Sequence, residues 1–324
     1  MIDSVFDRVF DRVFDCPRQR GAAIITALLV VAIVALIAGA LLAQQSQALT
    51  RTESVVGRAQ SRAYADTAAQ WARGVLFDDA KQGGIDYLGE PWAQGIAALP
   101  VENATLSGTL TDEAGRFNLN NLVRDGRASA PDVKLFRALL TNLALPPDLA
   151  GAVVDWIDAD TETTTPGGAE DLYYMALPSP YRAANRPLVM VDELLRVRGI
   201  DAKTLARLRP FVTALPVVTR INLNTAPEEV IAAALPLLPE ADRRKLVAER
   251  IARPFKDVAD IKRRYPAAAD LANTDLDVKS YWFSALVGVS AGAGAGAGAV
   301  QTRTLTLLRR DQGKWPVIIW QVPL

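Results

Sequence analysis

The feature that most constrains this chain is an uninterrupted run of uncharged, mostly apolar residues from Ala22 to Ala43. At a rise of ~1.5 Å per residue, a helix of this length extends ~33 Å, enough to cross the ~30 Å hydrocarbon core of a bilayer. Arg18 and Arg20 precede the run, and the next charged residue after it is Arg51. Because positive charges favour the cytoplasmic side of a span, we expect one transmembrane helix with a cytoplasmic N-terminus and the rest of the chain outside.

The composition excludes several kinds of chemistry. The 324 residues contain no histidine, so a Ser-His-Asp triad, a histidine metal site and an imidazole proton shuttle are all excluded. The single cysteine, Cys16, precedes the apolar run, so disulfides within the chain and cysteine-based metal sites are excluded as well. Any metal site must use oxygen ligands, which suit calcium or magnesium. The formal net charge is zero, so no global basic field attracts nucleic acid.

The junction before the apolar run, "RQRGAAIITALLVV", resembles a type IV prepilin signal. In that class a short basic leader ends in glycine, and a membrane peptidase cuts after it and leaves the apolar helix attached. The resemblance implies cleavage after Gly21 and a mature, methylated N-terminus at Ala22. Most members have glutamate at the fifth mature position, where this chain has Thr26. An uncleaved signal anchor is the alternative. We expect the repeat "VFDRVFDRVFD", Val5–Asp15, to be discarded with the leader.

A helical pattern continues beyond the predicted span. Tyr64, Ala68, Trp71 and Val75 recur at intervals of four, three and four residues, which predicts one buried stripe on a helix. The glycine-containing segment 78–84 predicts the end of this helix. Together the two halves predict a helix of roughly 50 residues, half in lipid and half packed on a domain.

Strand patterns flank a long helical middle. Alternating residues on both sides of the turn at 112–115 predict a β-hairpin over Ala104–Leu122. Three further β-rich segments, 280–290, 299–310 and 315–324, lie near the C-terminus, the first two separated by the low-complexity loop Ala291–Ala299. We therefore expect an α+β fold: a long N-terminal transmembrane helix, a small antiparallel sheet and a large α-helical insertion between its strands. The predicted divisions are a leader at 1–21, the span at 22–43, helix and first strands at 44–122, the insertion at 123–275 and the last strands at 276–324.

Carboxylates concentrate in the segment "VVDWIDADTETTTPGGAEDLYY", Val153–Tyr174. A predicted helix ends at 155–158, and the acidic residues that follow it lie on a Thr/Pro/Gly loop. Closely spaced carboxylates on a flexible loop suit a hard cation, although the spacing is not that of an EF-hand. Two alternatives are a solvated acidic loop with helix-capping aspartates, and a catalytic pair formed by Asp158 and Glu170.

Segments 191–212 and 221–261 resemble helix-hairpin-helix repeats. Such hairpins grip nucleic-acid phosphates with the backbone amides of a Gly-x-Gly turn. The first segment has only Gly199 at that turn, and the second has Pro236–Pro239 with no glycine. We therefore expect structural helices and no nucleic-acid partner. A membrane-anchored DNA-uptake or DNA-binding protein is the alternative function.

Five short motifs occur in a characteristic order after the glutamate-less signal. They are "GRFNLNNL" (115–122), "DWIDAD" (155–160), "GAED" (168–171), "VDELLRVRGI" (191–200) and "INLNTAPEEVI" (221–231). In this order they resemble the K-type minor pseudopilins of type II secretion systems. The resemblance implies a pilin-like α/β domain with a large helical insertion that binds calcium. Carried over to this chain, the candidate ligands are Asp158, Asp160, Glu170 and Asp171.

The resemblance also implies a function. It predicts a non-enzymatic subunit at the tip of a periplasmic pseudopilus, which initiates or caps that fibre for protein export across the outer membrane. The implied partners are the I- and J-type minor pseudopilins, the major pseudopilin, the prepilin peptidase, inner-membrane lipid and secreted substrates. The implied location is the inner membrane of a Gram-negative bacterium, with the globular part in the periplasm. A fibre glutamate is held to pair with the N-terminal amine of a neighbour, so Thr26 suits a subunit without a neighbour above it.

Overall fold

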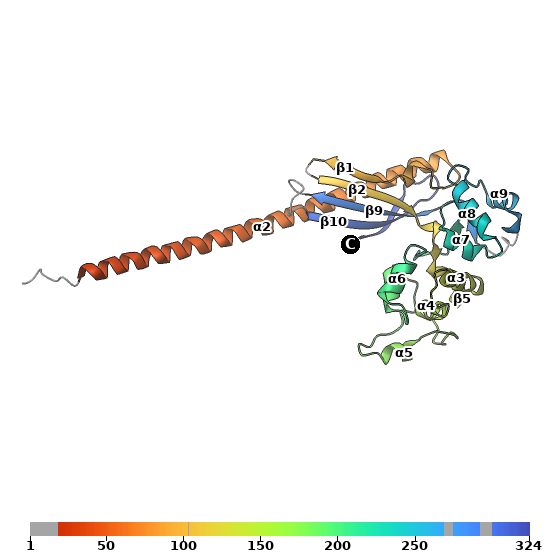
Figure 1. Ribbon diagram of the computed structural model, residues 1–324, viewed down its shortest axis with the longest axis horizontal. Coiled ribbons are helices and arrows are strands. Elements are labelled where there is room, and N and C mark those ends of the chain that lie inside the picture. The colour runs from red at the N-terminus through yellow and green to blue at the C-terminus, as the bar shows by residue number, and fades with distance from the viewer. Residues whose placement is uncertain (1–18, 103, 269–274, 292–299) are drawn as a thin grey trace, which may run out of the picture. The chain divides into compact units, whose positions relative to one another are not determined.

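The computed structural model describes residues 19–102, 104–268, 275–291 and 300–324 (Figure 1). The leader repeat and most of the Ala/Gly loop therefore lie outside the described residues. The chain divides into two compact units, Met1–Gln60 and Ser61–Leu324, and helix α2, Gln19–Gln82, contributes to both.

The apolar helix predicted near the N-terminus is confirmed. Within α2, Ile24–Leu49 is long and apolar enough to cross a membrane, with a mean hydropathy of 3.0 and none of its residues buried within the chain. This segment extends six residues beyond the predicted end of the span at Ala43. The helix ends at Gln82, inside the segment that the glycines indicated.

A five-stranded antiparallel sheet lies in the second unit, in the order β1-β2-β9-β10-β11. Its strands are β1 (Ile96–Val101), β2 (Ala104–Asp112), β9 (Trp282–Ala291), β10 (Val300–Arg309) and β11 (Val317–Pro323). The three C-terminal strands confirm the β-rich segments read from the sequence. Because β2 pairs directly with β9, the long helical region between them enters and leaves at one end of the sheet (Figure 1).

The part of α2 from Ser61 onward packs on one face of this sheet. Its buried stripe consists of Ser61, Ala65, Ala69, Ala72 and Leu76. The predicted stripe is offset from the buried one by one position: Tyr64, Ala68 and Val75 are half-buried against the core, and Trp71 is 56% exposed. Alanine side chains let a helix lie close to a flat sheet, whereas an indole on that face would hold it away. Full burial of a side chain such as Leu76 contributes ~1.5–3 kcal/mol to stability.

The hairpin predicted over Ala104–Leu122 is also wrong. The antiparallel partners of β2 are β1, which precedes it in the chain, and β9, which follows the insertion; neither lies in 113–122. After Asp112 the chain makes a short 3-10 helix at Glu113–Gly115 instead of a reversing turn. A Cβ atom at Gly115 would lie 2.7 Å from Thr225 Oγ1, so the chain passes closely against the insertion at this point.

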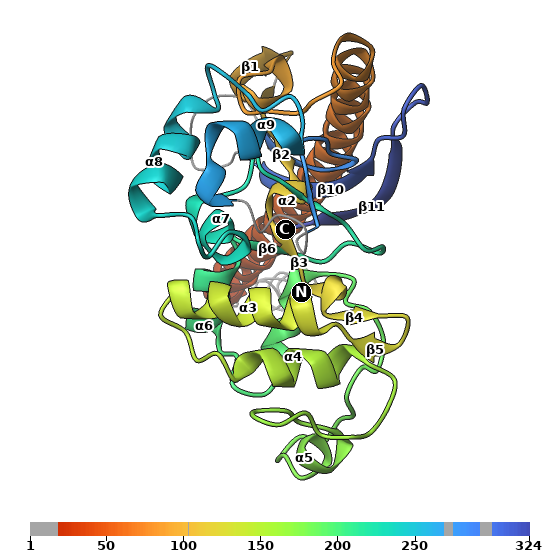
Figure 2. The same ribbon diagram turned by 90° about the vertical axis from the view of Figure 1, so that its right-hand side faces the viewer.

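The insertion is a helical body with its own apolar core (Figure 2). In it, α3 packs against both α4 and α7, and Phe117 and Phe136 stack with ring centroids 5.4 Å apart. Its helices are α3 (Ala130–Asn142), α4 (Leu149–Ile157), α5 (Asp171–Met175), α6 (Ala202–Leu208), α7 (Glu228–Ala234), α8 (Glu240–Glu249) and α9 (Val258–Arg264). Short strand pairs brace it: β3 (Phe117–Asn118) with β6 (Val212–Thr213), β4 (Val123–Arg124) with β5 (Arg127–Ala128), and β7 (Ile221–Asn222) with β8 (Leu276–Asp277). The predicted α+β fold is confirmed.

Candidate cation site

Three of the four predicted cation ligands come together. Carboxylate oxygens of Asp158, Asp160 and Glu170 all lie within 4.8 Å of one another. Asp158 is the residue that caps the C-terminus of α4, and Glu170 is the residue that precedes α5. Helix α4 is mostly apolar, and all of its residues are buried. The loop that follows it turns back and places Glu170 beside the end of the helix.

Two of these carboxylates are buried, and three of their oxygen atoms have no hydrogen-bond partner. The side chains of Asp158 and Glu170 belong to residues only 4% and 5% exposed. Asp158 Oδ1 and both carboxylate oxygens of Glu170 have no hydrogen-bond partner. A buried carboxylate without a partner costs several kcal/mol unless a proton or a cation neutralises it. These oxygens therefore fit a bound hard cation, for which they would supply ligands.

The electrostatics of the cluster point the same way. Burial raises the pKa of Asp158 to about 6, and the negative charges of Asp160 and Asp155 add to the shift. Burial likewise raises the pKa of Glu170 to about 7, with further contributions from the neighbouring carboxylates. Each shift reflects an unfavourable negative charge, which a divalent cation among the carboxylates would stabilise.

The loop between α4 and α5 is held by specific contacts. The Thr164 N–H donates to both carboxylate oxygens of Asp155 at 3.1 Å, and the Gly168 N–H donates to the Thr164 carbonyl at 2.8 Å. A Cβ atom at Gly168 would overlap Asp155 Oδ2, so this close approach requires glycine. Arg198 Nη1 donates to the Gly168 carbonyl at 3.0 Å and ties the loop to the following segment.

The fourth predicted ligand, Asp171, does not join the other three, and the sequence analysis did not single out Asp155, which supports the loop. Asp171 lies outside the cluster: its Oδ1 accepts a hydrogen bond from the Ala183 N–H at 2.9 Å, and its Oδ2 lies 3.7 Å from Arg182 Nε. Asp155 is fully buried and positions the loop instead. Its spacing of three residues from Asp158 puts both on one helix face, a signal that was available in "DWIDAD".

A second acidic cluster pairs with an arginine of this chain, Arg310. Oxygens of Asp79, Asp86 and Glu90 also lie within 4.8 Å of one another. The Arg310 guanidinium, however, donates to Asp79 Oδ2 at 2.6 Å and to Asp86 Oδ1. Glu90 Oε2 accepts a hydrogen bond from Trp92 Nε1 at 2.7 Å. The arrangement is an ion-pair network beneath the end of α2.

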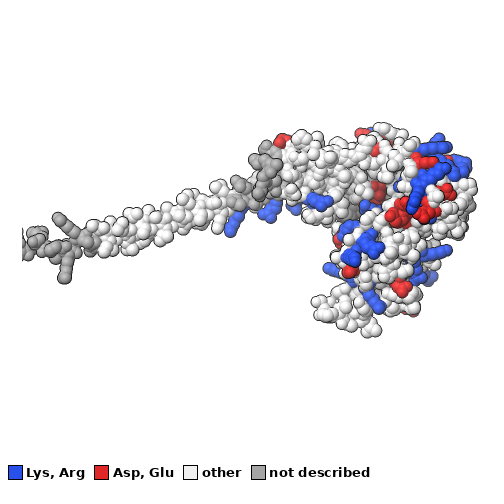
Figure 3. Space-filling model, viewed as in Figure 1, with Lys and Arg blue, Asp and Glu red and all other residues white. Residues whose placement is uncertain are grey.

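Several arginines of the helix-hairpin-helix-like region have partners within the chain. Arg250 is 4% exposed and donates to two backbone carbonyls. Arg244 pairs with Glu240, and Arg243 Nη1 donates to the Leu238 carbonyl at 2.7 Å. Figure 3 shows basic and acidic side chains interspersed over this part of the molecule. These contacts give the arginines structural partners and favour the structural interpretation over DNA binding.

The asparagines of "INLNTA" serve the fold. Asn222 Nδ2 donates to Asp112 Oδ2 at 3.0 Å and to Ser280 Oγ at 2.8 Å. Asn224 binds the backbone of Phe255 through both its donor and its acceptor. The asparagines of "FNLNNL", Asn118, Asn120 and Asn121, bind backbone groups of residues 215–219 in the same way.

Comparisons with known proteins agree with this architecture. Two family models, both described as "Type II secretion system (T2SS), protein K", match residues 115–217 and 221–279. The protein of that name from Aeromonas hydrophila is 33% identical over 300 residues, which cover 86% of this chain and 90% of the relative. The chain belongs to the type II secretion system protein K family. The Pseudomonas aeruginosa member is 34% identical over 286 residues and 85% of each chain.

A solved protein K structure has the same fold. The crystal structure of the GspK-GspI-GspJ complex from enterotoxigenic Escherichia coli contains a chain with a TM-score of 0.74 and 27% identity to this one. The match covers 85% of this chain and 99% of that chain. The protein K chain described here is therefore a minor pseudopilin component of a type II secretion system, as the sequence motifs predicted.

Proposed function

We propose that this protein K chain stands at the tip of the pseudopilus, where it initiates or caps the fibre for protein export across the outer membrane. The observation that carries the proposal is the position of the insertion. It leaves the sheet at Asp112 and re-enters at Trp282, the end of the sheet at which α2 also terminates (Figure 1). A body of this size at that end obstructs the stacking of a further subunit above it. The proposed role is structural and involves no catalytic step.

The partners proposed for this role are the I- and J-type minor pseudopilins. The homologous protein K was solved in a complex with GspI and GspJ, and the match extends over 99% of that chain. The test is co-expression of the full chain with both partners in membranes, followed by detergent extraction and affinity purification. We expect a stable complex of the three subunits. Recovery of the chain without either partner would argue against the tip position.

The same proposal includes processing and anchoring in the inner membrane. The "RQRGAA" junction supports cleavage after Gly21, which makes Ala22 the methylated N-terminus. The membrane-spanning segment Ile24–Leu49 follows it and stays in the mature chain. The N-terminus then lies in the cytoplasm and the globular part in the periplasm. N-terminal sequencing of the membrane-extracted protein tests this directly. A first residue other than Ala22 contradicts it, and a Gly21→Leu variant should retain its leader.

The acidic cluster is proposed as a calcium site of the mature protein. The unpartnered buried oxygens of Asp158 and Glu170, together with Asp160, support this assignment. A hard cation bound there would hold the ends of α4 and α5 together and thereby fix the fold of the loop between them. Titration calorimetry of the full chain in detergent, with calcium and then magnesium, tests the site. A lack of heat and of thermal stabilisation at millimolar calcium would remove it.

A further inference from the structure

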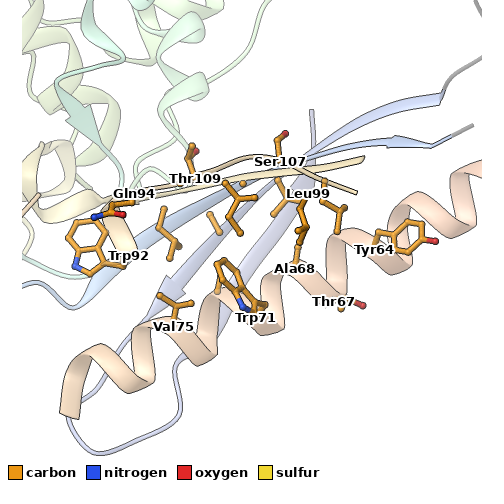
Figure 4. A pocket seen from close by; sticks show the side chains of 18 of the residues that line it. Tyr64, Thr67, Ala68, Trp71, Val75, Trp92, Gln94, Leu99, Ser107 and Thr109 are labelled. Carbon is orange, nitrogen blue, oxygen red and sulfur yellow. The ribbon is translucent and has the colours of Figure 1, made fainter. Parts of the chain in front are cut away.

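The loop that follows α2, residues 83–90, touches both the insertion and the sheet, and we call it the junction loop. Ile85 packs against the apolar core of the insertion. Trp92, two residues past the loop, belongs to the core between α2 and the sheet (Figure 4). A Cβ atom at Gly89 would lie 3.1 Å from the Ile251 carbonyl oxygen, so the loop also passes closely against the chain after α8. The junction loop therefore connects two separately packed parts of the second unit.

Asp86 is the residue of the junction loop that the insertion holds most directly. Its N–H donates to the Val278 carbonyl at 2.9 Å, and its carbonyl accepts a hydrogen bond from Asn222 Nδ2 at 3.0 Å. Its carboxylate accepts a hydrogen bond from the Ser280 N–H at 2.7 Å, just before the chain re-enters the sheet. Asp86 is 3% exposed. A change in the position of this one residue would disturb all three contacts.

Carboxylates around the junction loop outnumber the cations that bind them. Asp86 and Glu90 from the loop and Asp79 from α2 bring carboxylate oxygens within 4.8 Å of one another. Asp112, at the end of β2, is 4% exposed; burial raises its pKa to about 6, and the charge of Asp86 adds to the shift. Among the described residues, Arg310 is the one cation that donates to these side chains. Four carboxylates thus share one positive charge.

Glu90 is the cluster member that receives no hydrogen bond from Arg310. Its Oε2 accepts hydrogen bonds from Trp92 Nε1 at 2.7 Å and from the Tyr87 N–H at 2.9 Å, and both donors are uncharged. Glu90 is 8% exposed, so its ionised form adds a buried negative charge beside two others. Burial, with these neighbouring charges, raises the pKa of Glu90 to about 7. The added charge therefore appears as the pH passes through neutrality.

The other charged or ionisable side chains near the junction loop lie on its solvent side. Lys279 and Tyr281 are exposed and line a shallow pocket beside the loop. Lys81 forms an exposed ion pair with Asp78 at 3.0 Å. Charges in solvent are screened over short distances, so these groups offset a buried carboxylate only weakly. The balance within the cluster is set by its buried members.

We propose that the junction loop is a proton-operated latch between the insertion and the sheet. With Glu90 protonated, the loop holds its contacts to both parts. With Glu90 ionised, repulsion from its neighbouring carboxylates displaces the loop, and the insertion gains freedom to move at its two connections to the sheet. The latch is a property of this chain alone and does not depend on the proposed position at the fibre tip.

The direction of the effect follows from where the proton is held. The closed loop keeps the Glu90 carboxyl protonated up to a pH of about 7, whereas an opened loop exposes it and restores its ordinary value of 4.5. The closed form is therefore favoured at low pH and loses that advantage as the pH rises through 7. Between pH 6 and pH 8 the equilibrium constant for opening should increase about tenfold.

Hydrogen exchange of the full chain in detergent, measured by mass spectrometry and corrected for the intrinsic effect of pH, tests the latch. Amides of residues 83–90 should lose about tenfold protection between pH 6 and pH 8. Glu90→Gln keeps an acceptor for Trp92 and should reduce this loss to about threefold or less. The matched control is Glu240→Gln, at a side chain that is 60% exposed, which should behave as wild type.

Two outcomes of the exchange experiment would overturn the latch. Junction-loop amides that remain as protected at pH 8 as those of α3 and α4 in the core of the insertion would open only when the whole chain unfolds. A loss of protection that persists unchanged in Glu90→Gln would assign the pH response to another group.

A distance measurement tests the latch without any change at Glu90. In a Cys16→Ser background, spin labels at Trp71→Cys on α2 and Leu237→Cys on the insertion occupy exposed positions, 56% and 65% exposed in the wild-type chain. Their distance distribution should be narrow at pH 6 and broader at pH 8. A control pair within the insertion, Leu195→Cys and Leu237→Cys, should give the same distribution at both pH values. An unchanged distribution for the first pair, or equal broadening in the control pair, would overturn the proposal.

Discussion

The Asn222 amide donates a hydrogen bond to the Asp112 carboxylate at 3.0 Å, across 110 residues of sequence. Asp112 ends β2, where the chain leaves the sheet, and Asn222 ends β7 inside the insertion. The same carboxylate oxygen accepts hydrogen bonds from Ser280 Oγ at 2.5 Å and from Thr225 Oγ1 at 2.6 Å. Ser280 lies just before the chain re-enters the sheet at β9. One buried carboxylate thus joins the exit, the re-entry and the insertion.

Loss of the Asn222 side chain should therefore destabilise the chain strongly. Asn222→Ala removes donors to Asp112, to Ser280 and to the Asp86 carbonyl, all of them buried. Because the buried acceptors are then left without donors, the substitution should lower the free energy of unfolding by roughly 2–4 kcal/mol. Urea unfolding of the detergent-solubilised chain measures it. The control is Asn142→Ala on the exposed end of α3, which should cost less than about 0.5 kcal/mol; equal effects would contradict the role of Asn222.

The sequence predicted those parts of the fold that depend on local pattern. The apolar span follows from a lack of charge, and β9, β10 and β11 follow from alternation along neighbouring segments. The pairing of β2 was not predictable in this way, because "IAALPV" in β1 contains a proline and shows no alternation. Which face of α2 is buried depends on how closely the helix approaches the sheet, and the apolar period alone did not distinguish Trp71 from Ala72.

The sequence indicates that the candidate site is built from carboxylates, but it does not settle which carboxylates come together. Acidic spacing and family resemblance make Asp158, Asp160 and Glu170 candidate oxygen ligands, and the fold brings these three carboxylates together. Asp171 follows Glu170 directly, but as the first residue of α5 its side chain turns to the Ala183 N–H. The side chains of adjacent residues point in different directions at the start of a helix. Which of them faces the cluster depends on tertiary contacts, which cannot be read from composition.

Stability should fall as the pH rises from about 4.5 to 7. Burial raises the pKa of Glu90 to about 7 from its ordinary 4.5, and the charges of Asp79 and Asp86 contribute. The folded chain therefore holds a proton that the unfolded chain releases, and the stability this gives is lost as the pH passes through 7. Glu90→Gln keeps an acceptor for Trp92 and should raise the free energy of unfolding at pH 8 by on the order of 1 kcal/mol.

The measurement is urea unfolding of wild type and Glu90→Gln at a series of pH values. Burial also raises the pKa of Asp112 and of Asp158 to about 6 and that of Glu170 to about 7, so both proteins keep a further pH dependence and the measured quantity is the difference between them. The control is Glu240→Gln on α8, whose side chain is 60% exposed and should leave the pH profile unchanged. A Glu90→Gln profile that matches wild type between pH 5 and 8 would exclude this carboxylate as the source.

Neutralising Glu170, a proposed calcium ligand, should have opposite effects on stability with and without calcium. At pH 8 in chelator, Glu170→Gln removes a buried charge that repels Asp158, so the thermal midpoint should rise by about 2–4 °C, equivalent to ~1 kcal/mol. In calcium at about 100 times Kd, wild type should gain ~2.7 kcal/mol and the variant much less. Asp171→Asn, outside the cluster, should keep the wild-type response. A calcium response that survives in Glu170→Gln would rule out this ligand.

Glutamate at position 26 should not improve assembly. Thr26 lies near the start of the apolar span Ile24–Leu49, where a carboxylate without a partner costs up to ~2.5–3.5 kcal/mol, and less towards the end of the helix. A subunit at the tip has no neighbour above it whose terminal amine would offset this cost, so Thr26→Glu should initiate fibres at or below the wild-type frequency. Pseudopilus counts and secretion assays in a strain lacking the native protein measure this, with Thr26→Ser as the matched control. More frequent initiation by Thr26→Glu than by wild type would mean that a neighbour does lie above, and the chain would then belong within the shaft.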